Sequence, residues 1–273
     1  MPVSINTNVA SMQAMKNMNK NQQALKTSFN RLSSGLRINT AADDAAGLAV
    51  SESMKSQIRS YTVAERNAAD GVSMAQTAEG ALGEVHGVLG RMRELAMQSS
   101  NGTLSSSDRA QINNEFGELQ SEITRIQGSA KFNGVSVIAT ATASVTFQVG
   151  LDNGSADQID VSFGGVDLAT VLAGNASVDT ATNALDSLAS IDNAIDAVST
   201  SRAGFGASMN RLDIASSSIA TMKLNLSAAN SRITDVDVAA ESSALSRNQV
   251  LTQAGVSVLA QANQLPQMAF GLL

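Results

Sequence analysis

The stretch IDNAIDAVSTSRAGFGASMNRLDIASSSIATMKLNL, residues 191–226, decides the fold of this chain. Eight of eleven positions that step alternately by four and three residues within it are apolar; the eleven are Ile191, Ile195, Val198, Arg202, Phe205, Met209, Leu212, Ser216, Ile219, Lys223 and Leu226. Sustained heptads predict a helix wound on other helices. Built as one helix, the run would be about 54 Å long at 1.5 Å per residue, which favours a rod over a compact domain.

Proline is confined to the two ends of the chain, at Pro2 and Pro266. Because proline removes a backbone N–H and clashes with the preceding turn, its absence in between permits very long helices. Two more runs repeat the heptad spacing: Met74, Ala78, Ala81, Val85, Val88, Met92 and Leu95, and then Ile112, Phe116, Leu119, Ile123 and Ile126. We therefore expect a mainly α fold, a long antiparallel helical coiled-coil rod.

The helix boundaries follow from capping residues and turn residues. We expect helices over about 9–36, from 43 to about 99, over 105–128, over 181–229 and over 236–263, with Pro266 ending the last one. Thr40 with Asp43, and Asp108 with Gln111, have the spacing of a capping box, so we place helix starts there.

The middle of the chain changes its period from helical to alternating. Val145, Phe147 and Val149 alternate with polar residues, as do Ile159, Val161 and Phe163, and Asp152-Asn153-Gly154 lies between them. This pattern predicts a β-hairpin, preceded by a short strand after the turn Asn133-Gly134, within about 131–165. We expect the hairpin at the distal end of the rod, followed by a loop over 164–180.

Composition and charge exclude several functions. There is no Cys, and the single His86 leaves no room for a histidine metal cluster. The sequence starts without the features of a cleaved signal peptide, and no apolar run approaches a membrane span, so we expect no membrane insertion. Residues 1–42 carry five basic and no acidic side chains, spread over the helix without aromatic neighbours. We therefore expect a solvated face complementing an acidic neighbour, and no nucleic acid as a partner.

Several long segments, in order along the chain, resemble bacterial flagellins. They are INTNVASMQAMKNMNKNQQALKTSFNRLSSGLRINTAADDAAGLAVSESMKSQIR at 5–59, GRMRELAMQSSNGT at 90–103, SDRAQINNEFGELQSEI at 107–123, KFNGVSVI at 131–138, and SRITDVDVAAESSALSRNQVLTQAGVSVLAQANQLPQMAFGLL at 231–273. Only residues 164–180 separate the hairpin from the returning helix, so the resemblance is to a short, minimal flagellin without large outer domains.

The resemblance implies a structural protein and no enzyme. Flagellins polymerise into the extracellular filament of the bacterial flagellum, which serves motility, after export through the flagellar type III channel. The resemblance implies that 1–42 and 232–273 pair as helical assembly segments, while 43–180 and 181–231 form the rod. We expect the assembly contacts at Leu25, Phe29, Leu32, Leu36, Leu251, Val258, Leu259 and Leu265. Further partners implied are the export apparatus, a secretion chaperone and the filament cap; no cofactor is implied.

A second surface is implied by the segment around RMRELAMQ. In flagellins of the matching type this helix face makes filament contacts, and a host Toll-like receptor reads it. The corresponding residues here are Arg91, Met92, Glu94, Leu95 and Glu115. An arginine, a glutamate and a leucine within about a turn supply a donor, an acceptor and an apolar anchor.

Three alternatives to a filament subunit remain at this point. A hook–filament junction protein shares flagellin-like ends, and its copy number and position distinguish it. A cytoplasmic coiled-coil adaptor would stay inside the cell as a small oligomer. An enzyme carried in a flagellin frame needs an inserted domain, and 164–180 is too short to hold one.

Overall fold

The fold was analysed in a computed structural model, which describes residues 7–138, 143–164, 168 and 176–270, and the side chains up to 264 within the last range. The chain divides into two compact units. Unit 1 comprises 1–56 and 225–273, and unit 2 comprises 57–224. The predicted loop over 164–180 lies largely outside the described residues.

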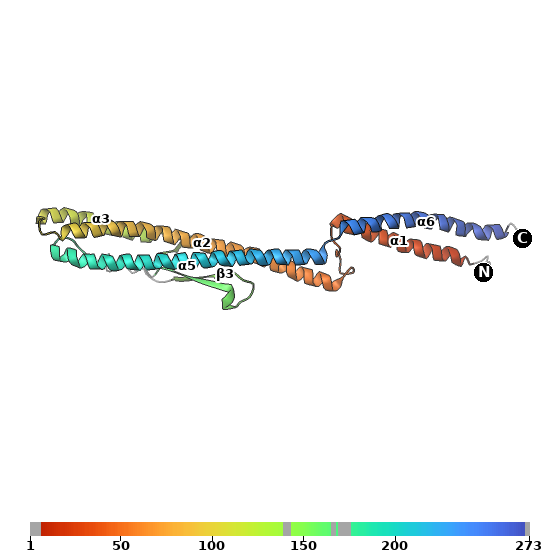
Figure 1. Cartoon of the computed structure of the whole chain (residues 1–273), viewed down its shortest axis with the longest axis horizontal. Helices are drawn as coiled ribbons and strands as arrows, with labels where there is room; N and C mark the ends of the chain where they lie inside the picture. The colour runs from red at the N-terminus through yellow and green to blue at the C-terminus, as the bar shows by residue number, and fades with distance from the viewer. Residues whose placement is uncertain (1–6, 139–142, 165–167, 169–175, 271–273) are drawn as a thin grey trace. The chain divides into compact units, whose positions relative to one another are not determined.

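Unit 2 is built from three helices: most of α2 (Ala45–Ser99), α3 (Ser106–Ser129) and most of α5 (Ala181–Thr234). They lie side by side in Figure 1, with α3 and α5 both antiparallel to α2. Residues 3–265 are free of proline, and α2 runs unbroken for 55 residues and α5 for 54. The prediction of a mainly α, antiparallel helical fold is confirmed.

Three ion pairs mark the antiparallel register of α2 and α5. Arg93 Nε lies 2.7 Å from Asp192, Arg202 lies 2.6 Å from Glu79, and Lys223 pairs with Glu65. Two of these side chains, Arg202 and Lys223, are the charged exceptions in the heptad run of α5. Their position beside α2 is explained by an acidic partner on the neighbouring helix.

The core of unit 2 shows why α2 has the richest apolar pattern. The predicted stripe is buried at Met74, Ala78, Val85, Met92 and Leu95. A second stripe, repeating every seven residues, is buried as well: Ala75, Leu82, Leu89 and Ala96 are at most 1% exposed. Because α2 packs against both α3 and α5, one apolar stripe cannot cover both contacts. Its two adjacent stripes together form a wide apolar face. Phe116 and Ile123 of α3 complete this core.

Two small antiparallel hairpins belong to unit 2. One pairs β1 (Lys131–Phe132) with β2 (Val135–Ser136), and the other pairs β3 (Ala143–Gln148) with β4 (Gln158–Phe163) in the register Val145↔Val161. A 3₁₀ turn, η1 (Ser155–Asp157), precedes β4. The strands predicted from the alternating residues are therefore confirmed.

The larger hairpin does not lie at the distal end, as the sequence had suggested. Asn67 of α2 donates a 3.0 Å hydrogen bond to the carbonyl of Gln148, and the rings of Phe163 and Phe205 are 5.4 Å apart, so the hairpin packs on the middle of α2 and α5. A Cβ added at Gly71 would lie 3.1 Å from Phe147, so a glycine permits this close approach. The reason is that α3 doubles back along α2 before the strands begin.

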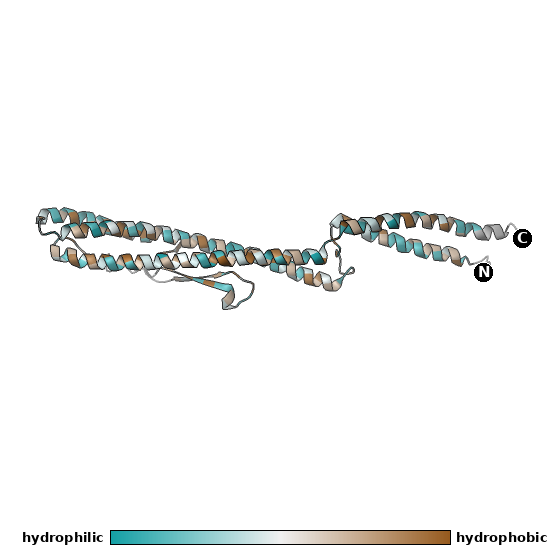
Figure 2. Ribbon diagram, viewed as in Figure 1, coloured by the Kyte–Doolittle hydropathy of each residue, from teal (hydrophilic) through white to brown (hydrophobic). Residues whose placement is uncertain are grey.

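Unit 1 pairs α1 (Val9–Ser34) with α6 (Val238–Phe270), and the two helices lie side by side in Figure 1. Gly35 ends α1 in the left-handed region, with φ of 71°, and its N–H bonds to the carbonyl of Arg31. This is a common helix stop because glycine has no Cβ to clash there. Hydrophobic residues recur along both helices in Figure 2.

Two predicted helix ends, one predicted helix start and one predicted capping pair were wrong. Helix α5 continues to Thr234, beyond the predicted end near 229. Pro266 does not end α6, which continues to Phe270; one proline removes only one hydrogen bond of the helix. Thr40 and Asp43 close a turn through a 2.9 Å bond from the Thr40 N–H, but α2 starts only at Ala45, where Asp44 accepts from the N–H of Gly47. Helix α3 starts where predicted, but its capping box joins Ser105 to Asp108, three residues before the predicted Asp108–Gln111 pair.

Candidate assembly and recognition surfaces

The α1·α6 pair is tied at one end by backbone hydrogen bonds. Leu36 and Asp235 form an isolated antiparallel bridge. On either side of it, the N–H of Arg37 donates to the carbonyl of Thr234 at 2.6 Å and the N–H of Val236 donates to the carbonyl of Gly35 at 3.0 Å. These bonds hold the end of α1 beside the start of α6.

The other end of the pair is tied by one side chain. Asn8 is the N-cap of α1, where its Oδ1 accepts from the N–H of Ser11 at 3.0 Å. Its Nδ2 donates to the carbonyl oxygen of Ala262 on α6, at 2.8 Å. Sequence reasoning missed this contact. The sequence feature that could have predicted it is Pro266, four residues after Ala262, because proline lacks the N–H that would bond to the Ala262 carbonyl.

Between these ties the two helices bury very little. The buried side chains of α1 are Ser11 and Ser28, and Ala262 is the buried side chain among residues 238–264 of α6. A helix pair without large buried side chains is marginal in water, because packing supplies most of the stability of a helix. Unit 1 therefore lacks a hydrophobic core of its own within the described residues.

Its large apolar side chains are instead exposed to solvent in the single chain. Of the predicted assembly residues, Phe29 is 54%, Leu251 43% and Val258 54% exposed. Four others are half-buried: Leu25, Leu32, Leu36 and Leu259. The side chain of Leu265 lies outside the described residues. Further apolar residues of the two helices, outside the predicted assembly set, are also exposed: Val9, Met12, Val238, Val250 and Val256.

The exposed residues of α6 face more than one direction. Leu251 and Val258 are seven residues apart and share one face, whereas Val238 and Val256, five helical turns apart, share another. A helix that is apolar on several sides is normally enclosed by neighbours. Within unit 1, α1 packs along α6, so the other apolar faces are left for a partner.

Charge also pairs the two terminal segments. Arg31 of α1 lies 3.7 Å from Glu241 of α6, and the guanidinium of Arg37 donates to the carbonyl of Ile233 at 2.6 Å. Of the five basic residues of 1–42, Arg31 thus meets an acidic side chain on the C-terminal segment, whereas Arg37 meets a backbone carbonyl there.

The predicted receptor face divides into exposed and buried residues. Arg91, Glu94 and Glu115 are exposed and form a cluster in which Arg91 lies 2.8 Å from each carboxylate. Met92 and Leu95, in contrast, are 0% and 1% exposed, because they belong to the stripe that α2 buries. The apolar anchor expected at Leu95 is buried in the single chain, and the accessible members of the predicted set are polar.

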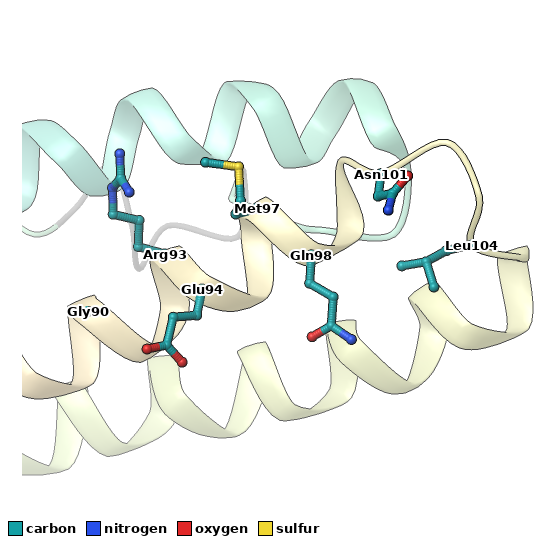
Figure 3. Close-up of a pocket in the computed structure, with 7 residues that line it drawn as sticks. All are labelled: Gly90, Arg93, Glu94, Met97, Gln98, Asn101 and Leu104. Carbon is teal, nitrogen blue, oxygen red and sulfur yellow. The ribbon is translucent and has the colours of Figure 1, made fainter.

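A cleft of about 610 Å³ lies beside this cluster, near the end of α2 (Figure 3). It is lined by Gly90, Arg93, Glu94, Met97, Gln98, Asn101 and Leu104. In Figure 3, Arg93 and Met97 extend toward α5, and Glu94 and Gln98 extend toward α3. Met97 is 53% exposed and is the large apolar side chain that this face offers.

Local hydrogen bonds shift several ionisable groups. The side-chain hydrogen bonds with Glu94 and then Glu115 raise the pKa of Arg91 above its usual value. The hydrogen bond with the Ser105 side chain lowers the pKa of Asp108, and the backbone N–H of Thr40 does the same for Asp43. These shifts come from helix-start bonds and surface ion pairs. No group of three His, Asp or Glu side chains able to hold a metal was found among the described residues.

Helices long and apolar enough to cross a bilayer are absent from the described part of the chain.

Comparison with known proteins places both ends of the chain in one family. The bacterial flagellin N-terminal helical region matches residues 5–143, and the bacterial flagellin C-terminal helical region matches 188–273. A flagellin from Halalkalibacterium halodurans is 45% identical over 271 residues, which covers 98% of this chain and 99% of that protein. The chain is thus as short as this relative, with no room for an inserted outer domain.

Solved structures give the same result for the fold. The crystal structure of Bacillus cereus flagellin is 30% identical, with a TM-score of 0.50, covering 60% of this chain and 94% of that one. A structure titled as a flagellar hook-associated protein from Vibrio parahaemolyticus has a TM-score of 0.61 over 71% of this chain and 100% of that one, but only 13% identity, which shows a shared fold alone. The chain belongs to the bacterial flagellin family, whose members are structural subunits of the flagellar filament and not enzymes.

Proposed function

We propose that this chain, a structural subunit of the flagellar filament, assembles by packing the apolar faces of its α1·α6 pair against the same pairs of neighbouring subunits. The observation that carries this proposal is the exposure of Phe29, Leu251 and Val258 in a helix pair whose buried side chains, among residues 9–34 and 238–264, are two serines and an alanine. Large apolar side chains left exposed on both helices of one pair are what an interaction surface offers to a partner.

The mechanism couples folding to assembly. Neighbouring pairs supply the buried area that α1 and α6 lack within one chain, so the terminal helices gain their stability as the subunit joins the polymer. The two helices of one pair present different faces, and in this proposal their contact between subunits is heterologous, with a rotation that does not close a ring. Repetition of it gives an open helical array, which is the form of a filament.

Truncation tests this mechanism. A chain lacking residues 1–36 should remain a folded, soluble, helical monomer by circular dichroism and sedimentation, because the unit 2 core is retained. It should form no filaments by electron microscopy after seeding, while the full chain elongates the same seeds. Filaments from the truncated chain would refute the role of the α1·α6 pair.

Only the shared fold supports the alternative of a hook–filament junction protein. A flagellin matches at 45% identity over nearly the whole chain, and this favours the filament. Imaging of the labelled protein on cells distinguishes the two: a filament subunit decorates the whole length, and a junction protein gives one band at the filament base.

Delivery to the growing filament involves further partners in this proposal. The chain is exported unfolded through the flagellar type III channel, accompanied before export by a secretion chaperone and folded beneath the filament cap. The weakly packed terminal helices support this, because segments that need neighbours to fold remain extended until the subunit arrives. A mutant strain without a working export channel should retain the chain in its cytoplasm.

Recognition by a host Toll-like receptor is assigned to the polar face of Arg91, Glu94 and Glu115. Exposed, mutually oriented arginine and glutamate side chains are suited to bidentate contacts. Replacing Arg91 and Glu115 by alanine should reduce signalling by monomer about thirtyfold, as expected for loss of an interface anchor. The matched control replaces Arg125 and Glu122, a similar exposed pair on α3. Equal loss in both variants would place recognition elsewhere.

A further inference from the structure

The starting observation is a gap in the hydrogen bonding of α6. In an α-helix the N–H of each residue bonds to the carbonyl four residues earlier. Pro266 has no N–H, so it cannot donate a hydrogen bond to the carbonyl of Ala262, although α6 continues through this position to Phe270. Ala262 is only 7% exposed, and a buried carbonyl without a partner is costly.

Asn8 supplies a donor to this carbonyl from the other helix. Its Nδ2 lies 2.8 Å from the Ala262 oxygen, and its Oδ1 accepts from the N–H of Ser11. One orientation of the amide satisfies both bonds, because one atom must donate and the other must accept. The same side chain therefore caps α1 and replaces the N–H that Pro266 lacks.

Apart from the Arg31–Glu241 ion pair near the Leu36–Asp235 bridge, the rest of the α1·α6 interface gives little information about register. Its buried side chains are small, and small side chains allow two helices to slide past each other at low cost. Polar contacts at single positions are known to set the register of helix pairs. The bridge between Leu36 and Asp235 fixes one end, and the Asn8–Ala262 bond fixes the other, across the stretches 8–36 and 235–262 of nearly equal length.

We propose that Asn8 and Pro266 form a register lock, in which the proline frees the Ala262 carbonyl and the asparagine of α1 binds it. A slip of α1 along α6 by one helical turn would move Asn8 to a carbonyl already bonded within α6. It would also leave the Ala262 carbonyl without a hydrogen-bond donor. The lock thus selects one alignment of the terminal helices, and with it the pattern of apolar faces offered to neighbouring subunits.

The inference rests on the proposed assembly function, and a double-mutant cycle on the full chain tests it. Asn8→Asp retains the cap of α1, since aspartate is as good an N-cap as asparagine, but removes the donor. We expect it to raise the critical concentration for elongation of seeded filaments about tenfold. Pro266→Ala restores the N–H of α6 and makes the donor redundant. In that background Asn8→Asp should change the critical concentration less than twofold.

Asn17→Asp is the matched control, because it adds the same charge at an exposed position of α1. The thermal transition of the unit 2 core, followed by circular dichroism, should be identical in all variants. If Asn8→Asp abolishes assembly, recovery of filaments in the double variant supports the lock. An equal effect of Asn8→Asp in both backgrounds would overturn it, because Asn8 would then act without Pro266. Failure of the wild-type chain to elongate would instead contradict the assembly function.

Discussion

Units 1 and 2 are both made of long heptad-patterned helices, yet they use their apolar residues in opposite ways. In unit 2 the stripes of α2 close against α3 and α5, and Leu82, Leu89 and Leu212 are at most 1% exposed. In unit 1 the helix α6 meets α1, and Val250 and Val258 are 65% and 54% exposed. The difference shows that an apolar heptad pattern does not determine whether a helix is stable within the single chain. The number of neighbouring helices in the same chain against which its apolar faces pack determines this.

The largest expected effect breaks the core of unit 2. Leu89→Asp places a charge at a fully buried position of α2, where an unpaired charge costs several kcal/mol. We expect the helical signal of the monomer to be lost at room temperature, or its melting temperature to fall by more than 10 °C. A stable monomer carrying this substitution would show that unit 2 does not have the core described above.

The contrasting substitution in unit 1 should leave the monomer intact. Val258→Asp adds the same charge where the single chain is open to solvent, so the melting temperature of the monomer should change by less than about 1 °C. Assembly should fail, because neighbouring subunits would have to bury the carboxylate. Seeded elongation measured by light scattering checks this. Normal elongation would exclude Leu251 and Val258 from the intersubunit contact.

The smallest expected effect concerns the pH dependence of the stability of the unit 2 core. The hydrogen bond with Ser105 lowers the pKa of Asp108, so this group stabilises the folded core above its unfolded pKa of about 3.9. The contribution is lost as the pH falls through the still lower folded pKa. Asp108→Asn removes the titration, so the melting temperature of the monomer should fall less between pH 5 and pH 2 than in wild type.

Asp192 and Glu122 have pKa values lowered by Arg93 and Arg125, so the wild-type acid response is shared among several groups. The difference between Asp108→Asn and wild type is therefore one part of the total slope. Identical pH profiles for the two proteins would show that the capping box contributes no pH-dependent stability.

Much of unit 2 could be predicted from residue spacing. The heptads of 191–226 become the buried seam of α5, and the alternating residues near Val145 and Val161 become paired strands. The second seam of α2 could not be seen as easily, because two of its four members, Ala75 and Ala96, are small. The position of the hairpin depends on α3 folding back, which is a tertiary property that periodicity does not contain.

The surfaces were less predictable than the helices. Resemblance pointed to the segment around Arg91, but burial decides which of its residues are accessible, and Leu95 is not. The Asn8–Ala262 bond was missed because capping rules look within one helix, whereas this side chain serves two. A proline beyond the first turn of a helix is a usable signal for such contacts, since it leaves the carbonyl four residues earlier without its usual donor.

Hydrogen exchange of backbone amides, followed by mass spectrometry in monomer and in filament, tests the central claim most directly. In the monomer, amides of α2 and α5 between 57 and 224 should be protected, whereas those of α1 and α6 should exchange within seconds, because few buried contacts hold them. In the filament, α1 and α6 should become protected as well. Protection of α1 and α6 in the monomer equal to that of α2 would contradict the account, since the terminal pair would then fold without neighbouring subunits.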